Sequence, residues 1–149
     1  MITLQTELLK DIKVESEILL TSHYNELTLN KHAIKLNPDW DRYFELESKN
    51  KFHCFTARND SVLVGYSAFF VDSHIHYRDL LVAANDVLFL REDLRLGTTG
   101  IRLIKFSEQQ LKLLNVNKIT WHVKFAKDFR VILHRMGYSD EDTIVGKIL

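Results

Sequence analysis

The sequence predicts an α+β fold built on a mixed β-sheet, and three observations support this class. Helical spacing dominates the first third of the chain, and three β-leaning segments follow in the middle. After them the pattern alternates between strand and helix up to the end. The middle segments favour antiparallel hairpins, whereas the strand–loop–helix–strand unit at residues 81–124 favours a parallel or splayed strand pair.

Two helical segments are expected before the first β-leaning segment. Apolar residues at helical spacing predict a helix over residues 8–29, with an interruption near Thr21-Ser22 left open. Asn37 can cap a second helix, with Pro38 at its first position, where the missing N–H costs nothing. We expect this second helix to end at about Glu47.

Three strands are expected in the middle of the chain. Residues 52–58 are aromatic and β-leaning, and Asn59-Asp60-Ser61 is typical of a hairpin turn. A second strand over residues 62–71 leads into a polar connection at residues 72–80. The third strand, over residues 81–90, is apolar enough to be buried on both faces.

The C-terminal half returns to an alternation of helices and strands. Glycine, charge and amphipathic spacing mark the boundaries of its elements. In chain order we expect a charged loop at 91–100, an amphipathic helix at 101–114, a strand at 118–124, a helix at 128–136 stopped by Gly137, and a last strand at 143–149.

Length and composition limit the classes of function. With 149 residues, the chain has the size of one domain, which we expect to span residues 1–149. Twenty basic and twenty acidic residues give a net charge of +0, which disfavours nucleic acid as a partner and leaves a homodimer open. The chain start lacks the order of a signal peptide, and no apolar run reaches the ~18 residues of a membrane span. A cytoplasmic location without membrane contact is therefore expected.

The segment from Arg91 to Gly100 is the most informative part of the sequence for function. A buried strand ends, a loop with glycines turns and a helix starts, and free amides at such a helix start can bind an anion. Glycine lets a phosphate approach the backbone, and Arg91, Arg95 and Arg102 carry charge that suits a phosphate. From these residues alone, an ordinary strand-to-helix turn with surface arginines fits equally well.

At this segment the sequence resembles the GNAT superfamily of acetyl-coenzyme-A-dependent N-acyltransferases. The signature of the superfamily, Arg/Gln-x-x-Gly-x-Gly/Ala after a strand and at a helix start, is matched by Arg95-Leu-Gly-Thr-Thr-Gly100. The preceding strand matches at Val87–Leu90, the hairpin strand at Val62–Tyr66 and the C-terminal turn at Met136-Gly-Tyr138. The resemblance covers residues 52–149 in order, and in character the chain is similar to small GNAT proteins carried by bacteriophages.

The resemblance implies a GNAT-like sheet, mostly antiparallel and twisted with one splayed parallel strand pair, flanked by about four helices. It implies acetyl-CoA as co-substrate, no metal, and transfer of the acetyl group to a primary amine by direct attack in a ternary complex. The pyrophosphate would rest on amides around Leu96–Ile101, the pantetheine arm between strands 81–90 and 118–124, and the acetyl carbonyl on the Leu90 N–H. The implied coenzyme-binding residues are Leu88, Phe89, Leu90, Arg95, Leu96, Gly97, Thr98, Thr99, Gly100, Ile101 and Arg102.

Two departures from the GNAT pattern affect the expected chemistry. The central glycine of the signature is Thr98 here, so either Gly97 takes over the close approach or the loop is shifted. The tyrosine that usually protonates the departing thiolate is replaced by Leu133, and an asparagine near the start of that segment by Ala126. These departures keep an alternative open, in which the chain is a non-catalytic GNAT-fold binding or protein-interaction module.

Three residues are candidates for the missing acid. His122 lies in the strand beside the expected thioester slot, and His134 follows Leu133 on the next helix. Tyr138 is the third candidate, although its position resembles that of a buried aromatic residue in the superfamily. For each histidine alone, a structural or exposed role is the competing interpretation.

Asp86 is the candidate base, because an amine with a pKa of ~10 must lose a proton before it can attack. A carboxylate in an otherwise apolar strand is costly without a partner. Asp86 stands four residues before Leu90, and strand alternation would put both on one face. It can act as general base, directly or through water, or anchor a cationic substrate; a hydrogen-bonded structural aspartate or a sheet-edge residue is the equal alternative.

His74, His76 and Tyr77 form a second polar cluster, in the predicted connection at 72–80. His76 and Tyr77 are the candidate substrate residues, for a small-molecule or peptide amine. A solvated loop is the competing interpretation, and a metal site lacks further ligands. Cys54, the only cysteine, is not expected to be a nucleophile, because no His/Asp arrangement can be assigned to it.

Overall fold

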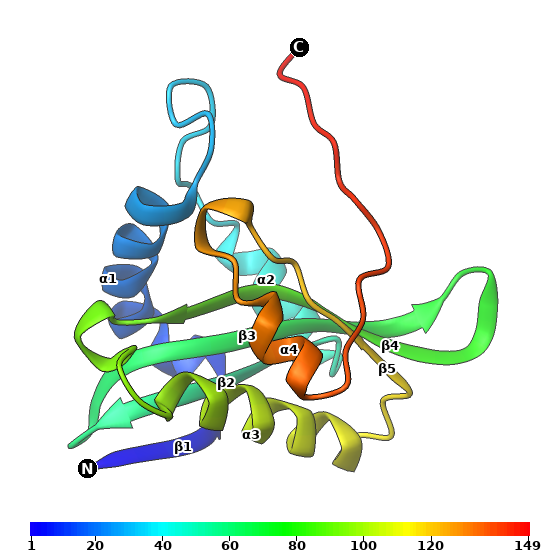
Figure 1. The fold of residues 1–149 in the computed structure, drawn as a ribbon, viewed down its shortest axis with the longest axis horizontal. Helices are drawn as coiled ribbons and strands as arrows, with labels where there is room; N and C mark the ends of the chain where they lie inside the picture. The colour runs from blue at the N-terminus through cyan, green and yellow to red at the C-terminus, as the bar shows by residue number, and fades with distance from the viewer.

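In the computed structural model, which describes residues 1–149, a five-stranded sheet runs through the centre of the molecule (Figure 1). The strands lie in the order of the chain, and the first four pair antiparallel, whereas the last pair is parallel. The predicted mixed sheet, mostly antiparallel with one parallel pair, is confirmed. The strands are β1 (Ile2–Glu7), β2 (Phe52–Asn59), β3 (Val62–His74), β4 (Tyr77–Leu90) and β5 (Lys118–Thr120).

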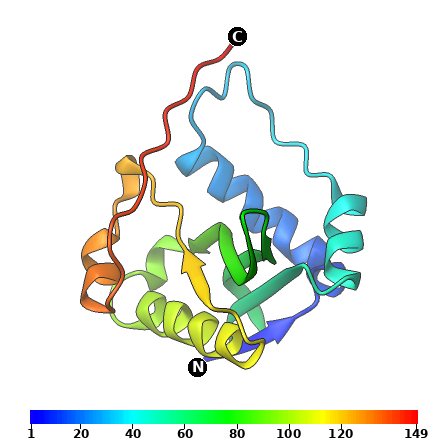
Figure 2. The same ribbon diagram turned by 90° about the vertical axis from the view of Figure 1, so that its right-hand side faces the viewer.

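Helices cover both faces of the sheet (Figure 2). On one face lie α1 (Leu9–Leu27) and α2 (Trp40–Ser48), and on the other lie α3 (Thr99–Leu113) and α4 (Arg130–Arg135). Two short 3-10 turns, η1 (Glu92–Leu94) and η2 (Phe125–Lys127), follow β4 and β5. None of the helices combines the length and the apolar composition that crossing a bilayer requires.

Each face of the sheet has its own hydrophobic core. Leu9, Ile12 and Leu19 of α1 pack on the face that carries Tyr66 and Phe89. The opposite core joins side chains of the sheet to α3, and its members include Phe55, Phe69, Leu90, Leu103 and Leu111. Burial of these large side chains on both faces supplies the main driving force for the fold.

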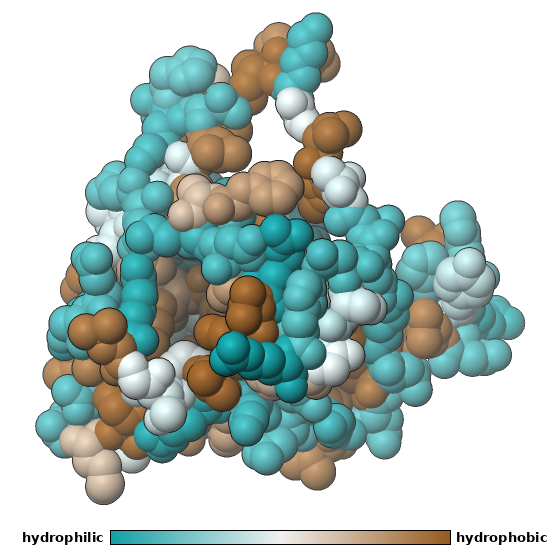
Figure 3. Space-filling model, in the orientation of Figure 1, coloured by the Kyte–Doolittle hydropathy of each residue, from teal (hydrophilic) through white to brown (hydrophobic).

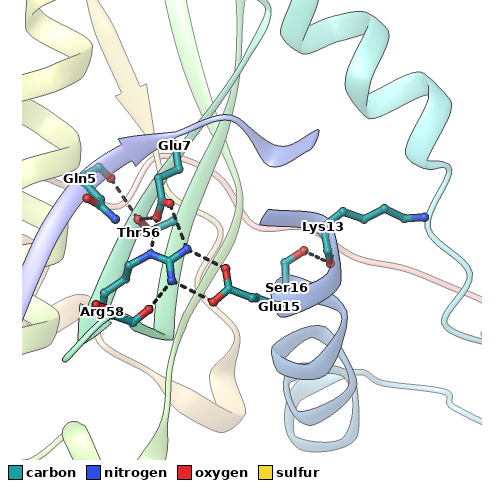
Figure 4. A network of polar contacts seen from close by, with 8 residues as sticks. Gln5, Glu7, Lys13, Glu15, Ser16, Thr56 and Arg58 are labelled. Carbon is teal, nitrogen blue, oxygen red and sulfur yellow. Dashed lines mark hydrogen bonds and ion pairs between the residues drawn. The ribbon is translucent and has the colours of Figure 1, made fainter. Parts of the chain in front are cut away.

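The first strand, to which the sequence analysis assigned no element, is tied to the rest of the molecule through Arg58 of β2. The Arg58 side chain is 13% exposed and bonds to two carboxylates, with its Nε 3.0 Å from Glu7 of β1 and its Nη2 2.7 Å from Glu15 of α1 (Figure 4). Burial raises the pKa of Glu7, but the hydrogen bonds from Arg58 and Thr56 outweigh it and leave that pKa below its usual range. One guanidinium therefore joins β1, β2 and α1.

The start of α2 differs from the prediction. The helix begins at Trp40, and the Asp39 carboxylate caps it by accepting a hydrogen bond from the Arg42 amide at 3.1 Å. The prediction of Asn37 as the cap and Pro38 as the first helical residue was wrong, because Asp39 has the right spacing to the free amide. The first helix, in contrast, runs without interruption from Leu9 to Leu27.

Three predictions near the edges of the sheet were also wrong. Residues 72–80 are not a separate polar connection, because β3 and β4 continue through them as a hairpin that turns at Ile75-His76. Polar residues are tolerated there, since this end of the hairpin projects beyond the helices (Figure 1). Residues 143–149 form no strand, because no other strand pairs with them. The fifth strand ends at Thr120 rather than Lys124.

Candidate active site

A gap opens between β4 and β5 because their parallel ladder is short. Only Val82–Ala84 pair with Lys118–Thr120. Beyond these pairs β4 continues to Leu90, while the other strand ends and leads toward η2. The predicted splayed strand pair is thus confirmed, and the edge of β4 that follows Ala84 lacks a neighbouring strand.

The Leu90 amide points into this gap. Leu90 lies opposite Gly65, and the next amide, that of Arg91, donates to the Val64 carbonyl at 2.8 Å. Because bonded and non-bonded pairs alternate in an antiparallel ladder, the Leu90 N–H faces away from β3. Gly65 permits the close approach of the strands, since a Cβ there would lie 2.8 Å from Leu90 Cδ1 and 2.9 Å from the Phe89 oxygen.

The loop after β4 presents a row of free amides at the start of α3. None of the six amides from Leu96 to Ile101 donates to the backbone or to a side chain, and the first helical bond is that from Arg102 to the Thr98 carbonyl. Gly97 takes a φ of +110°, which favours glycine, and Thr98 makes no side-chain cap. No acidic residue lies in the first turn of α3. The segment can therefore receive an anion.

The arginines expected beside this anion site are engaged within the protein. Arg95 bonds through both terminal nitrogens to Glu26 of α1, at 2.6 and 2.7 Å, and through Nε to the Leu90 carbonyl at 2.7 Å. It thereby ties α1 to the end of β4, and its role as a phosphate ligand stays a prediction. The other two make more exposed contacts, Arg91 with Asp93 and Arg102 with the Ile2 carbonyl.

Asp86 occupies a β-bulge in β4. Ala68 pairs with Val87 and Phe69 with Asn85, so that Asp86 is the extra residue between two pairs. The buried Asn85 amide holds the bulge, donating to the Ala68 carbonyl at 3.2 Å and to the Val87 carbonyl at 3.0 Å.

The bulge changes which face Asp86 occupies. Asp86 and Val87 both line the α1–α2 side of the sheet, whereas Leu90 belongs to the core under α3. The expectation that Asp86 and Leu90 share a face was wrong, because the extra residue shifts the alternation of side chains by one position.

The surroundings of Asp86 raise its proton affinity. Burial raises the pKa of Asp86, and the hydrogen bond from the Tyr43 hydroxyl, 2.8 Å from Oδ2, offsets part of that rise. The charge of His122 also lowers this pKa, which places His122 within electrostatic reach of the carboxylate. Burial next to Asp86 in turn raises the pKa of Tyr43 well above its usual range, so Tyr43 stays a hydrogen-bond donor.

Asp86 and Tyr43 lie in the wall of a cavity of about 310 Å³ on the α1–α2 side of the sheet. Most of its lining is apolar or aromatic. Sequence reasoning missed this cavity, because its walls come from α1, α2, the segment between them and three strands, which only the tertiary fold brings together. The lining residues are Leu9, Ile12, Ser16, Leu20, Tyr24, Thr28, Ile34, Lys35, Leu36, Asn37, Pro38, Trp40, Tyr43, Phe52, Cys54, Tyr66, Ala68, Asp86 and Val87.

The three candidate acids occupy different places. His122 is exposed just after β5 and acts electrostatically on Asp86. His134 lies exposed on α4, with Nε2 2.9 Å from Asp140 Oδ1. Tyr138 donates to a carboxylate oxygen of Glu108 on α3 at 3.3 Å. Of the three, the structure brings only His122 to the surroundings of Asp86.

His76 and Tyr77 lie at the tip of the β3–β4 hairpin with His74, away from the cavity lining. Their role as substrate residues stays a prediction. No group of three or more His, Cys, Asp or Glu side chains converges in a way that could hold a metal ion. Cys54 is buried in the cavity wall, and burial raises the pKa of its thiol to about 12.

His23, to which the sequence analysis gave no role, links α1 to the sheet beside this site. Its ring stacks on Phe89 at 5.1 Å, and Nδ1 lies 3.0 Å from the Tyr66 hydroxyl. Burial, together with the charges of Lys124 and Arg95, lowers the pKa of His23 to about 4. The ring is therefore neutral at neutral pH. A histidine in a helical pattern gives no sequence signal for such a position.

Comparison with known proteins places this geometry among acetyltransferase structures. No family model matches the sequence, and no curated protein matches it either. A GCN5-related N-acetyltransferase from Ralstonia eutropha JMP134 is similar over 99% of each chain, with a TM-score of 0.77 and 11% identity. The chain has the GNAT fold.

Two further structures carry ligands. A predicted acetyltransferase from Clostridium acetobutylicum, solved with acetyl-CoA, has a TM-score of 0.72 and 16% identity, over 99% of this chain and 96% of that one. An aminoglycoside acetyltransferase from an uncultured soil metagenomic sample, in complex with sisomicin, has a TM-score of 0.74 and 14% identity, over 99% and 95%. At such identities the likeness establishes the fold, and the chemistry must come from the residues of this chain.

Proposed function

We propose that this protein is an N-acetyltransferase that uses acetyl-CoA as co-substrate and a small-molecule or peptide amine as acceptor. The observation that carries the proposal is the row of six free amides from Leu96 to Ile101, directly after a strand whose Leu90 amide opens into a gap. The GNAT fold of the chain and the acetyl-CoA in a similar structure support it.

Each part of the site has a task in this proposal. The free amides and the dipole of α3 hold the pyrophosphate, and the gap between β4 and β5 holds the extended pantetheine arm. Acetyl-CoA supplies an activated acetyl thioester. The Leu90 N–H donates to the acetyl carbonyl and stabilises the negative charge that develops on its oxygen when the amine attacks.

Proton transfer is assigned to groups around the bulge. Asp86 accepts a proton from the ammonium of the acceptor, directly or through water, and its raised pKa brings it nearer to the range useful for a base at neutral pH. His122 is the first choice for protonating the departing thiolate, because it is the one candidate acid in electrostatic contact with Asp86. His134 and Tyr138 are the second choices, since each already has a carboxylate partner.

Coenzyme binding tests the proposal through Gly100. A Cβ at Gly100 would meet only Leu90 Cδ2, at 3.9 Å, so the variant Gly100→Glu fits sterically while placing a negative charge in the first turn of α3. We expect its acetyl-CoA dissociation constant to rise at least about tenfold in calorimetry. Gly146→Glu, in an exposed segment where a Cβ meets nothing within 4 Å, is the matched control. No heat from the unmodified protein at millimolar acetyl-CoA would refute the proposal.

A non-catalytic binding module is the second candidate, favoured by Leu133 at the position where the superfamily usually has the acid. Leu133 is 4% exposed and packs as an ordinary core residue, so it supplies no proton. Release of free thiol from acetyl-CoA, measured against a panel of amines and peptides, separates the two candidates. Steady release with any acceptor supports the enzyme, and coenzyme binding without release supports the module.

A further inference from the structure

The cavity beside Asp86 contains one negative charge in a mostly apolar wall. Among its lining residues, Asp86 is the only carboxylate and Lys35 the only basic side chain. One oxygen of Asp86 accepts the Tyr43 hydroxyl at 2.8 Å, and no protein group donates to the other. A partly buried carboxylate with a free oxygen is best satisfied by a single cationic donor.

The rest of the wall fits a compact apolar body. Trp40, Tyr43, Phe52 and Tyr66 contribute aromatic rings, and aliphatic side chains from α1 and from the segment between α1 and α2 complete the apolar lining. A volume of about 310 Å³ lies at the lower end of the range of small-molecule sites, so the cavity suits a compact ligand.

The same wall disfavours acceptors with several positive charges. A second ammonium group would lose its hydration without meeting a second carboxylate, and Lys35 would repel it. A long polar peptide would likewise leave its backbone groups unsatisfied against the aromatic lining.

We propose that this cavity binds a primary amine with one positive charge and a compact, apolar, preferably aromatic body, anchored by its ammonium on Asp86. The identification of this ligand as the acetyl acceptor rests on the proposed function. Strand β4 connects the cavity to the proposed acetyl-CoA site. Asp86 and Val87 line the cavity, and the amide of Leu90, on the same strand, faces the gap.

Direct binding to the full chain, without coenzyme, tests the charge and shape of the ligand. We expect 2-phenylethylamine to bind at least about tenfold more tightly in calorimetry than 2-phenylethanol, spermidine or sisomicin. In Asp86→Asn, 2-phenylethylamine should lose at least about tenfold in affinity while 2-phenylethanol does not change. Asp72→Asn, which removes an exposed carboxylate paired with Lys51, is the matched control and should leave both affinities unchanged.

The possible results separate this inference from the proposed function. Tighter binding of spermidine or sisomicin than of 2-phenylethylamine overturns the inference, and so does an unchanged amine affinity in a folded Asp86→Asn. If that variant does not fold, the ranking of the four ligands on the unmodified protein decides. Binding of 2-phenylethylamine without thiol release keeps the inference and removes the enzyme. Thiol release with another amine, when 2-phenylethylamine neither binds nor reacts, supports the enzyme and overturns the inference about the cavity.

Discussion

At the scale of single residues, the site depends on side chains whose protonation is set by burial. Asp86 is driven toward the neutral acid and His23 toward the neutral base, and burial is the largest cause in both. For Asp86, the hydrogen bond from the Tyr43 hydroxyl offsets part of the cost of burying the charged carboxylate. The pKa remains raised, so this carboxylate holds a proton more readily than an exposed one. For His23, the neutral ring can stack on Phe89 without bringing a further positive charge near Arg95 and Lys124.

The stability of the protein should therefore depend on pH through His23. In the unfolded chain this histidine takes up a proton near pH 6.5, but in the folded protein only near pH 4. The contribution of His23 to stability is full above pH 6.5 and is lost as the pH falls toward 4, by about 3 kcal/mol. Urea unfolding over this range should show a smaller loss in His23→Gln than in the unmodified protein. Equal losses would contradict the assigned pKa. The raised pKa of Asp86 changes stability with pH in the opposite direction. Asp86 is present in both proteins, so its contribution cancels in the comparison.

At the scale of elements, the bulge in β4 decides what faces the cavity. Without the extra residue, regular alternation would bring Asp86 to the side where Leu90 packs under α3. Asn85 holds the bulge in place. Its side chain is 2% exposed, and its amide donates hydrogen bonds to the carbonyls of Ala68 and Val87.

Removal of that amide should loosen the bulge and weaken the site together. Asn85→Ala removes both hydrogen bonds of this buried side-chain amide, and we expect a loss of about 1–3 kcal/mol in the free energy of unfolding. The affinity for 2-phenylethylamine should fall as well, because Asp86 is no longer held in one direction. Asn117→Ala, which breaks one exposed hydrogen bond to the Leu81 amide, is the control. A destabilised Asn85→Ala with full amine affinity would show that the bulge does not position Asp86.

Sequence patterns predicted the elements whose signals are local. The hairpin turn at Asn59-Asp60-Ser61 and the amphipathic helix before Leu114 follow from residue type and spacing, and the structure confirms both. The free amides after Leu90 were predicted in the same way, since a strand, a loop with glycines and a helix lie in one stretch of chain. The bulge at Asp86 has no such signal, because it exists only relative to the pairing of β3.

The cavity and the ends of the sheet could not be predicted, for a similar reason. Tyr43 and Asp86 are far apart in sequence and meet only when α2 packs on the sheet. Residues 143–149 have the composition of a strand but lack a partner strand within the chain. The first strand did carry an alternating signal, with Ile2 and Leu4 both packed against the core under α3, and it could have been identified.

At the scale of the whole molecule, Arg58 joins three elements that are distant in sequence. Its side chain is 13% exposed, and its guanidinium compensates the charge of the partly buried Glu7 carboxylate. Arg58→Met should cost about 2–4 kcal/mol in the free energy of unfolding, because the partly buried Glu7 carboxylate loses its counter-charge and keeps only the hydrogen bond from Thr56. Arg91→Met, which removes a more exposed ion pair with Asp93, should cost much less. Similar losses in urea unfolding of the two variants would show that Arg58 is not a central connection.

Self-association is the last property expected at this scale, and the C-terminal segment is where it should occur. Residues 143–149 stand away from the body of the molecule (Figure 3), and Ile144 and Val145 are 77% and 89% exposed. On the sheet, β5 is the last strand and its outer edge is unpaired. We therefore expect a homodimer in which this segment of one copy packs along β5 of the other.

Sedimentation velocity over a range of protein concentrations tests the dimer. The unmodified protein should shift from monomer to dimer as its concentration rises, because pairing buries apolar side chains that water now surrounds. Val145→Lys should remain a monomer at concentrations where the unmodified protein dimerises, since a charged side chain replaces an apolar contact. Val62→Lys, which changes an apolar residue that is 57% exposed elsewhere on the sheet, should dimerise normally. A monomer at every concentration would mean that this segment has no partner in a second copy.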